Sequence, residues 1–288
     1  RQPRRVRREA PARGTCAVWL GGLLDRCQRI ERTARQLVDQ LNLDARQGEA
    51  AIRAAHFCKH DLVSQMVGEF PELQGLMGGK YLLEEGEPKE VALAVVEHYL
   101  PRGAGDQLPS SDAGAVVALA ERLELLLSIF AKGERPSGSS DPYALRRAGN
   151  GLLQIVWDRG WRLDLSCFLG SAVEDWTALF PEFVIDSSAR HQDLCQLLRQ
   201  RIVSQLEDEG FAPDLVQAVS AESVPTERLL ADPMDVRERL DLLNALRQSK
   251  ALPALMAVVQ RAARLAEKGD LVETDLKVSA VVSPERFE

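Results

Sequence analysis

The sequence predicts an all-α protein, and three observations support this fold class. Apolar residues recur at three- and four-residue spacing along most of the chain, which is the period of an amphipathic helix. Asp, Ser and Pro precede many of these segments, and Gly or Pro follows them, as residues that start and end helices do. Alternating apolar and polar runs, which would predict strands, are nearly absent.

The length and composition of the chain predict about two globular domains. The chain has 288 residues, and domains commonly have roughly 100–200. Apolar residues make up 45% of it, but no apolar run approaches the ~18 residues of a membrane helix, so we expect a soluble protein without membrane contact. The net charge of −7 argues against indiscriminate nucleic-acid binding but permits a local basic face.

The cysteines predict a reducing, cytoplasmic location. They form no CxxC pair, and most lie in apolar helical stripes, as reduced and buried thiols do. The five cysteines are Cys16, Cys27, Cys58, Cys167 and Cys195.

Residues 1–15 are expected to be a severed linker or the end of an upstream domain. Residues 1–13 are rich in arginine, but no apolar stretch follows them, so they are not a secretory signal. A phosphate-binding arm is the alternative. At the other end, Ser283-Pro284 is typical of a helix start, so we expect the natural protein to extend beyond both ends.

Two long helices are predicted at the start of the first domain. The first runs from Trp19 to Leu41, with one apolar stripe and charged residues opposite. Asp44 is a candidate N-cap for the second, which carries the motif HFCKHD and ends near Gly68. The segment from Phe70 to Gly79 mixes apolar residues with glycines, which predicts a bend packed under other elements.

Three more helices are predicted for residues 91–100, 116–130 and 143–157. A proline ends the first of them. Ser110, Ser111 or Asp112 can cap the second, which is strongly apolar. Asp141-Pro142 places a capping carboxylate and a proline before the third.

A boundary between two helical domains is predicted at residues 166–190. The sequence LDLSCFLGSAVEDWTALFPEF there predicts two short helices, or one helix and a connector. Residues 16–165 then form the first domain and residues 191–288 the second. Helices are predicted in the second domain at 193–207, after Pro213, after the Asp232-Pro233 cap, and at 253–268.

His60-Asp61 is the dipeptide that most invites a catalytic interpretation. Phosphohydrolases of the HD superfamily hold a metal with an early His, a His-Asp pair on a helix and a later Asp, because imidazole and carboxylate suit divalent metals. Here no His precedes His56, which lies one turn before His60 on the same predicted helix. Glu121 and Glu124 stand where the later Asp is expected. We therefore predict a degenerate HD motif of His60, Asp61 and Glu121 without metal, with a metal-dependent phosphohydrolase as the alternative.

No other catalytic arrangement is visible in the sequence. A GxSxG motif is absent, and Cys58 is close to His56 and His60 only along one predicted helix. The segments MGGK and AKGERPSGSSD lack the Walker spacing and follow no strand. We predict that this chain holds no catalytic residue, no cofactor and no ATP site.

Arginines on helical segments are the candidates for RNA binding. Such side chains reach phosphates while the opposite face of the helix stays in the core. The alternative is a solvated surface with ordinary ion pairs. The candidates are Arg146, Arg147, Arg159, Arg162, Arg199, Arg201, Arg261, Arg264 and Lys268.

Three blocks in the same order resemble one known family. They are KHDLVSQMVGEFPELQGLMG, GEPKEVALAVVEHYLPRGAGDQLP and ALAERLELLLSIFAKGERPSGSSDPYALRRAGNGLLQI. Together they are similar to the β subunit of the bacterial two-subunit glycyl-tRNA synthetase. The resemblance is strong over residues 16–157 and weaker after 165, where LPALMAVVQRAARLAEK resembles the anticodon-binding helices of the family.

The resemblance implies an HD-like helical domain followed by a helical anticodon-binding domain. It implies a β subunit that binds tRNA(Gly) and works with a separate α subunit, where ATP and glycine react. Within the matching blocks, Arg146 and Arg147 become the first candidates for tRNA contacts, and Arg261 and Arg264 the candidates in the later helix.

The sequence also departs from the family pattern. A segment expected to read ADKLDTL reads AERLELL here, so that Glu121 and Glu124 replace both Asp residues. The segment QRAARLAEK departs from the basic, Asn-containing pattern of the anticodon-binding helices. These departures weaken a metal site and direct anticodon contacts.

Overall fold

The fold is all-α, as predicted. A computed structural model describes residues 22–137, 140–179 and 186–267, and these contain thirteen α-helices, two 3₁₀ helices and no strand beyond one isolated bridge between Ser137 and Ser140. The expectations for residues 1–15, Trp19, Lys268 and Ser283-Pro284 lie outside the described residues. Chain contacts divide the protein into two units, Arg1–Leu240 and Asp241–Glu288.

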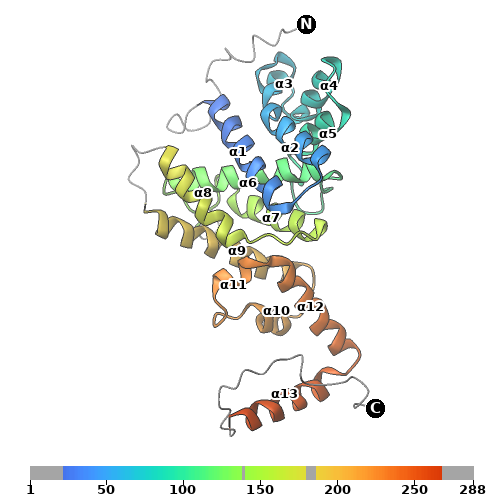
Figure 1. The fold of residues 1–288 in the computed structure, drawn as a ribbon, viewed down its shortest axis with the longest axis vertical. Coiled ribbons are helices and arrows are strands. Elements are labelled where there is room, and N and C mark those ends of the chain that lie inside the picture. Colours follow the sequence, from blue (N-terminus) through green and yellow to red (C-terminus); the bar gives the residue numbers. More distant parts are fainter. Residues whose placement is uncertain (1–21, 138–139, 180–185, 268–288) are drawn as a thin grey trace. The chain divides into compact units, whose positions relative to one another are not determined.

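The first unit contains most of the helices (Figure 1). In its first half they are α1 (Leu23–Leu41), α2 (Ala45–Phe57), η2 (His60–Val63), α3 (Gln65–Glu69), η3 (Pro71–Leu73), α4 (Leu76–Glu84), α5 (Lys89–Glu97), α6 (Asp112–Ala131) and α7 (Leu145–Arg159). In its second half they are α8 (Leu165–Leu179), α9 (Ser187–Asp208), α10 (Pro213–Ser220), α11 (Thr226–Ala231) and the start of α12 (Pro233–Gln248).

The core of this unit is built around α6. This helix lies among the other helices of the unit in Figure 1 and contacts α1, α2, α5, α7, α8 and α9. Its side chains are buried almost all round. The sequence of α6 explains this burial, since it is apolar on nearly every face. Such a helix is stable only when other helices enclose it. Of the three candidate caps, the Ser111 side chain is the one that accepts a hydrogen bond from the helix, from the Gly114 N–H.

The predicted long helix through HFCKHD is broken, which corrects the sequence prediction. Asp44 caps α2 by accepting the Gln47 N–H at 3.1 Å, as expected, but α2 ends at Phe57. The backbone of Ser64 is extended, and its hydroxyl donates to the Asp61 carbonyl and accepts the Val67 N–H. Ser64 therefore ends one turn and begins α3, because a local side-chain bond competes with a continued helix.

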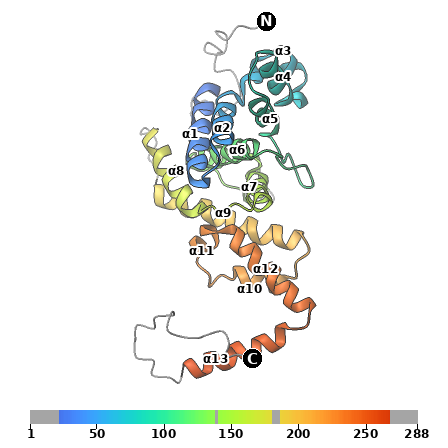
Figure 2. The same ribbon diagram turned by 45° about the vertical axis from the view of Figure 1, so that its right-hand side comes forward.

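The segment of residues 70–79, predicted to be a bend packed under other elements, instead contains the start of α4. A turn at Gly75, with a φ of +79°, leads into α4, and the side chains of Phe70 and Leu76 are largely exposed and not packed underneath. Gly78 and Gly79 let α4 lie directly on α5, and the two helices are side by side in Figure 2. A Cβ at Gly79 would be 2.8 Å from the Ala92 carbonyl oxygen, so this approach requires glycine.

The second half of the unit follows the predicted helix order with one addition. Residues 165–179 form the single helix α8, and α11 is a short helix that the periodicity did not predict. The Asp141 carboxylate accepts the N–H groups of Leu145 and Arg146, so it caps α7 although the helix begins later than predicted. The predicted domain boundary at 166–190 remains a prediction.

The second unit contains the end of α12 and α13 (Leu252–Ala266). No side chain of α13 is buried, and apolar residues such as Val258 and Leu265 are exposed.

The cysteines follow the prediction except at one position. Cys27, Cys58 and Cys195 are free and buried, whereas the free Cys167 is exposed. Cys16 lies outside the described residues.

Candidate nucleic-acid interface

The Asp61 carboxylate is part of the fold. It is completely buried, and its Oδ2 accepts the Gly75 N–H at 2.7 Å and the Gly78 N–H at 3.0 Å. These groups lie at the start of α4, where N–H groups lack partners within the helix and where negative charge is favoured. Asp61 therefore caps α4 from a distant part of the chain.

The two neighbouring histidines do not converge on one site. His60 lies on η2, where its Nδ1 donates to the Phe57 carbonyl at 2.5 Å. His56 lies on α2, half exposed, and its Nδ1 is 2.8 Å from a carboxylate oxygen of Glu31. The expectation that both share one helix is wrong, because α2 ends between them.

Glu121 and Glu124 are paired with basic side chains from other helices. Arg26 on α1 donates to both carboxylates, at 2.9 Å to Glu121 and 2.8 Å to Glu124. Arg29 contacts Glu124 at 2.8 Å. Although burial raises the pKa of Glu121, the charges of Lys59 and Arg26 hold that pKa well below its ordinary value.

Lys59 supplies a positive charge inside this cluster. Its side chain is 2% exposed, and its ammonium lies 3.2 Å from Glu121 and 3.9 Å from the centre of the Tyr99 ring. Burial opposes the charge, but Glu121 and Tyr99 raise the pKa of Lys59 above its ordinary value. In the described part of the chain, no group of three or more His, Cys, Asp or Glu could hold a metal ion.

Arg146 and Arg147 lie in the first turn of α7. The side chain of Arg147 is exposed and that of Arg146 is partly exposed. Arg201 on α9 lies close to Arg146, because its stem packs against Gly149, one turn further along α7. All three arginines are candidates from the sequence, but only the packing of α7 against α9 brings Arg201 close to Arg146.

Three other candidate arginines already have partners within the protein. Arg159 contacts Asp112 and the Pro109 carbonyl, and Arg162 pairs with Asp232 and Glu238. The buried Arg199 donates to the carbonyls of Ser220 and Ala221 at the end of α10 and of Val224 in the turn after it. These contacts occupy guanidinium groups that the sequence alone left available for phosphates.

Arg261 and Arg264 are exposed on α13 in the second unit. They are three residues apart, so they lie on one side of the helix. Within the described residues, no ion pair joins Arg147, Arg261 or Arg264 to a carboxylate.

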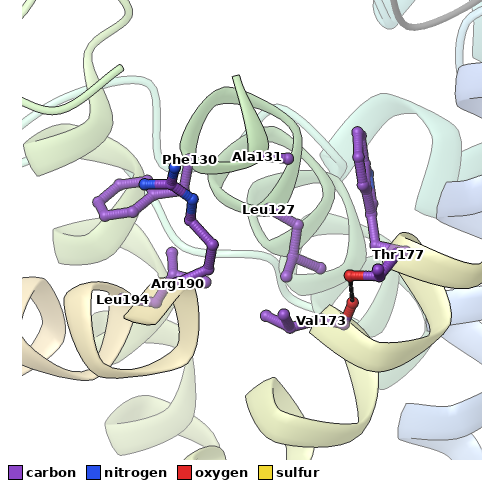
Figure 3. A pocket seen from close by; sticks show the side chains of 8 residues that line it. Leu127, Phe130, Ala131, Val173, Thr177, Arg190 and Leu194 are labelled. Carbon is purple, nitrogen blue, oxygen red and sulfur yellow. Dashed lines mark hydrogen bonds between the residues drawn. The ribbon is translucent and has the colours of Figure 1, made fainter. Parts of the chain in front are cut away.

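A small hollow lies where α6, α8 and α9 meet (Figure 3). Its volume of about 10 Å³ has room for about one water molecule. Its wall is formed by Leu127, Phe130, Ala131, Val173, Trp176, Thr177, Arg190 and Leu194. Of the described helices, none is both long and apolar enough to cross a membrane.

The described residues define an all-helical protein whose buried Asp61 supports the fold and whose candidate arginines include a set paired within the protein and a set exposed without paired carboxylates. Its sequence matches the family model described as glycyl-tRNA synthetase beta subunit over residues 16–221, and so the chain belongs to this family. The match continues past residue 157, where the motifs themselves become weaker.

Individual relatives agree with the family model. A glycine–tRNA ligase beta subunit from Acaryochloris marina is 46% identical over 93% of this chain and 38% of its own length. The beta subunit from Picosynechococcus is 43% identical over 93% of this chain and 37% of its own length. That from Halalkalibacterium halodurans is 43% identical over 71% of this chain and 29% of its own length. The chain thus spans less than two fifths of these relatives.

Proposed function

We propose that this chain is the tRNA-binding and assembly portion of a glycine–tRNA ligase β subunit. In this proposal it supports ATP-dependent attachment of glycine to tRNA(Gly) in the cytoplasm, with the chemistry and ATP on a separate α subunit. The observation that carries the tRNA-binding role is the exposure of Arg147, Arg261 and Arg264, which form no ion pairs with carboxylates within the described structure. Family membership supports the ligase and its partners.

Phosphate binding gives these arginines a physical role. A guanidinium group contacts a phosphate without reading sequence, so such contacts fix the position of an RNA. Holding the tRNA in place lowers the entropic cost of presenting its acceptor end to an active site on another polypeptide. We assign Arg146 and Arg147 to an HD-like domain of residues 16–165, and Arg261 and Arg264 to an anticodon-binding-like domain of residues 191–288, joined by a connector at 166–190.

The geometry gives no support to a metal-dependent phosphohydrolase. One Asp61 oxygen already accepts two backbone N–H groups, and Glu121 is neutralised by Arg26 and Lys59. These side chains have protein partners where a hydrolase would need metal ligands.

The test is the affinity of the 288-residue chain for tRNA(Gly), measured by fluorescence anisotropy at several salt concentrations. Changing Arg146→Ala together with Arg147→Ala is expected to weaken binding and to lower the slope of log K against log salt by about one per lost phosphate contact. Arg228→Ala, at an exposed position on α11, is the matched control. If the double variant binds with the affinity and slope of the control, these arginines do not bind the tRNA.

A further inference from the structure

The packing of α7 against α9 brings two arginines together. Gly149 on α7 has no side chain, and a Cβ there would be 3.0 Å from Cγ of Arg201 on α9. The stem of Arg201 therefore lies directly on α7. Arg146 precedes Gly149 by three residues, about one helical turn, and its charge acts on the guanidinium of Arg201.

The position of Arg201 is unfavourable in the protein alone. Its Nε is buried and has no hydrogen-bond partner in the described structure. Burial and the charge of Arg146 lower its pKa, while Asp141 and Asp208 oppose this in part. Asp141 is already engaged, since its two oxygens accept the Leu145 and Arg146 N–H groups. An unfilled donor beside a like charge costs stability.

Arg199 shows the opposite arrangement on the same helix. It lies two residues before Arg201, and its guanidinium donates to three backbone carbonyls at the end of α10 and in the turn after it. This arginine has the partners expected of a side chain that serves the fold. Within the described residues, Arg201 has no such carbonyl partners, and its stem packs against α7, the helix that carries Arg146.

We propose that Arg146 and Arg201 together bind one phosphate group of an RNA backbone, an inference that rests on the proposed tRNA-binding function. A phosphodiester carries one negative charge and two oxygens that accept charge-assisted hydrogen bonds from two guanidinium groups. Its binding removes the repulsion between the two arginines and supplies acceptors for the terminal N–H groups of the Arg201 guanidinium. Arg147, exposed on the next position of α7, contacts a neighbouring phosphate.

The inference predicts that one substitution changes stability and binding in opposite directions. Arg201→Met keeps the length of the stem and removes the charge, so the melting temperature of the 288-residue chain is expected to rise. Affinity for tRNA(Gly) is expected to fall, and the salt slope of binding to decrease by about one. Thermal unfolding and fluorescence anisotropy measure the two effects. A purely structural role for Arg201 would lower the melting temperature instead, and that result overturns the inference.

Two controls make the result specific. Arg199→Met is expected to lower the melting temperature, because it leaves buried carbonyls without a donor. Arg228→Met, at an exposed position on α11, is expected to change neither the melting temperature nor the salt slope beyond a small effect of charge. If Arg201→Met binds tRNA like Arg228→Met, the inference is wrong.

A double-mutant cycle tests whether the two arginines share one phosphate. If they do, the combined loss of affinity in Arg146→Met with Arg201→Met is smaller than the sum of the single losses. Strictly additive losses place them on separate phosphates and overturn the shared site.

The proposed function and this inference fail in different ways. A chain that shows no salt-dependent binding of tRNA at all contradicts the proposed function. Weakened binding in the variant of Arg146 and Arg147, with unchanged binding in Arg201→Met, contradicts this inference alone. Displacement of the tRNA by polyglutamate at equal charge, with the same dependence on Arg201, shows that the site binds polyanions in general and also contradicts the inference.

Discussion

At the scale of single residues, Asp61 shows how a motif with catalytic associations is used for structure. Its Oδ2 accepts hydrogen bonds from Gly75 and Gly78, which lie 14 and 17 residues later in the chain. The sequence identifies the His60-Asp61 pair, but the partners of the carboxylate are backbone groups. Backbone partners carry no side-chain signature, so sequence reasoning had no means of finding them.

Removing the Asp61 carboxylate is expected to destabilise the protein. In Asp61→Ala the buried N–H groups of Gly75 and Gly78 lose their acceptor, and the free energy of unfolding should fall by about 1–3 kcal/mol. Urea unfolding measures this, with Asp44→Ala at an exposed N-cap as a comparison that should cost about 1 kcal/mol. A wild-type chain that binds stoichiometric divalent metal, lost in Asp61→Ala, would falsify the structural role.

His98 predicts a pH dependence of stability. Burial, reinforced by the charge of Lys59, lowers the pKa of His98 well below its ordinary value of 6.5, although the Val95 carbonyl and Glu121 oppose this. The folded protein keeps the ring neutral where the unfolded chain would protonate it. Unfolding therefore takes up a proton below about pH 6.5, and stability falls as the pH is lowered through that value.

The expected contribution is up to about 1.4 kcal/mol per pH unit. It is measured by urea unfolding between pH 5.5 and 7.5, where His98→Asn should show a smaller dependence on pH than the wild-type chain. Both proteins should have the same slope above pH 7. Equal slopes below pH 6.5 would show that His98 is not the responsible group.

At the scale of elements, the close packing of α4 on α5 depends on glycine. Gly79→Ala would place a Cβ 2.8 Å from the Ala92 carbonyl oxygen and against the Val96 side chain. The helices must then separate, and we expect a loss of about 1–3 kcal/mol in the free energy of unfolding. Urea unfolding of the variant measures this loss.

Gly68 on α3 is the matched control for that change. A Cβ there meets nothing within 4 Å, and its backbone is helical. Gly68→Ala should therefore leave stability unchanged or raise it by roughly 0.5–1 kcal/mol. If both variants behave alike, packing between α4 and α5 does not explain the glycine at position 79.

The order of most helices was predicted from periodicity and caps, with three exceptions: the helix through HFCKHD, α4 where a glycine-rich bend was predicted, and α11. The sequence HFCKHD has helical spacing, yet α2 ends at Phe57. The Ser64 side chain bonds local backbone groups, and the Asp61 carboxylate binds the N–H groups of Gly75 and Gly78 at the start of α4. The helix α11 was missed because its six residues are too few for a periodic pattern.

At the scale of the whole molecule, many arginines of the described residues are paired with other groups of this acidic protein. The net charge is −7, and Arg159, Arg162 and Arg199 are engaged with carboxylates or carbonyls. Arg146, Arg147 and Arg201 share one region of α7 and α9. A local basic face of this kind permits RNA contacts without general attraction to polyanions.

The proposed division of labour predicts that the 288-residue chain does not charge tRNA. Incubation with glycine, ATP and tRNA(Gly) should give no glycyl-tRNA in an acid-gel assay, and adding α subunit alone is not expected to restore full charging. A complete β subunit with α subunit is the positive control. Robust charging by the chain alone would contradict the assignment of the chemistry to another polypeptide.

The helical class, the positions of most helices and the family all followed from residues that act locally, through caps, apolar spacing and ordered motifs. The partners of each charged side chain did not. Arg199 and Arg201 are two residues apart on one helix and are equivalent in the sequence pattern. Arg199 nevertheless donates hydrogen bonds to carbonyls at and after the end of α10, whereas Arg201 lies beside Arg146. Contacts between residues distant in sequence arise when helices pack, and a local pattern carries no information about which partners that packing brings within reach.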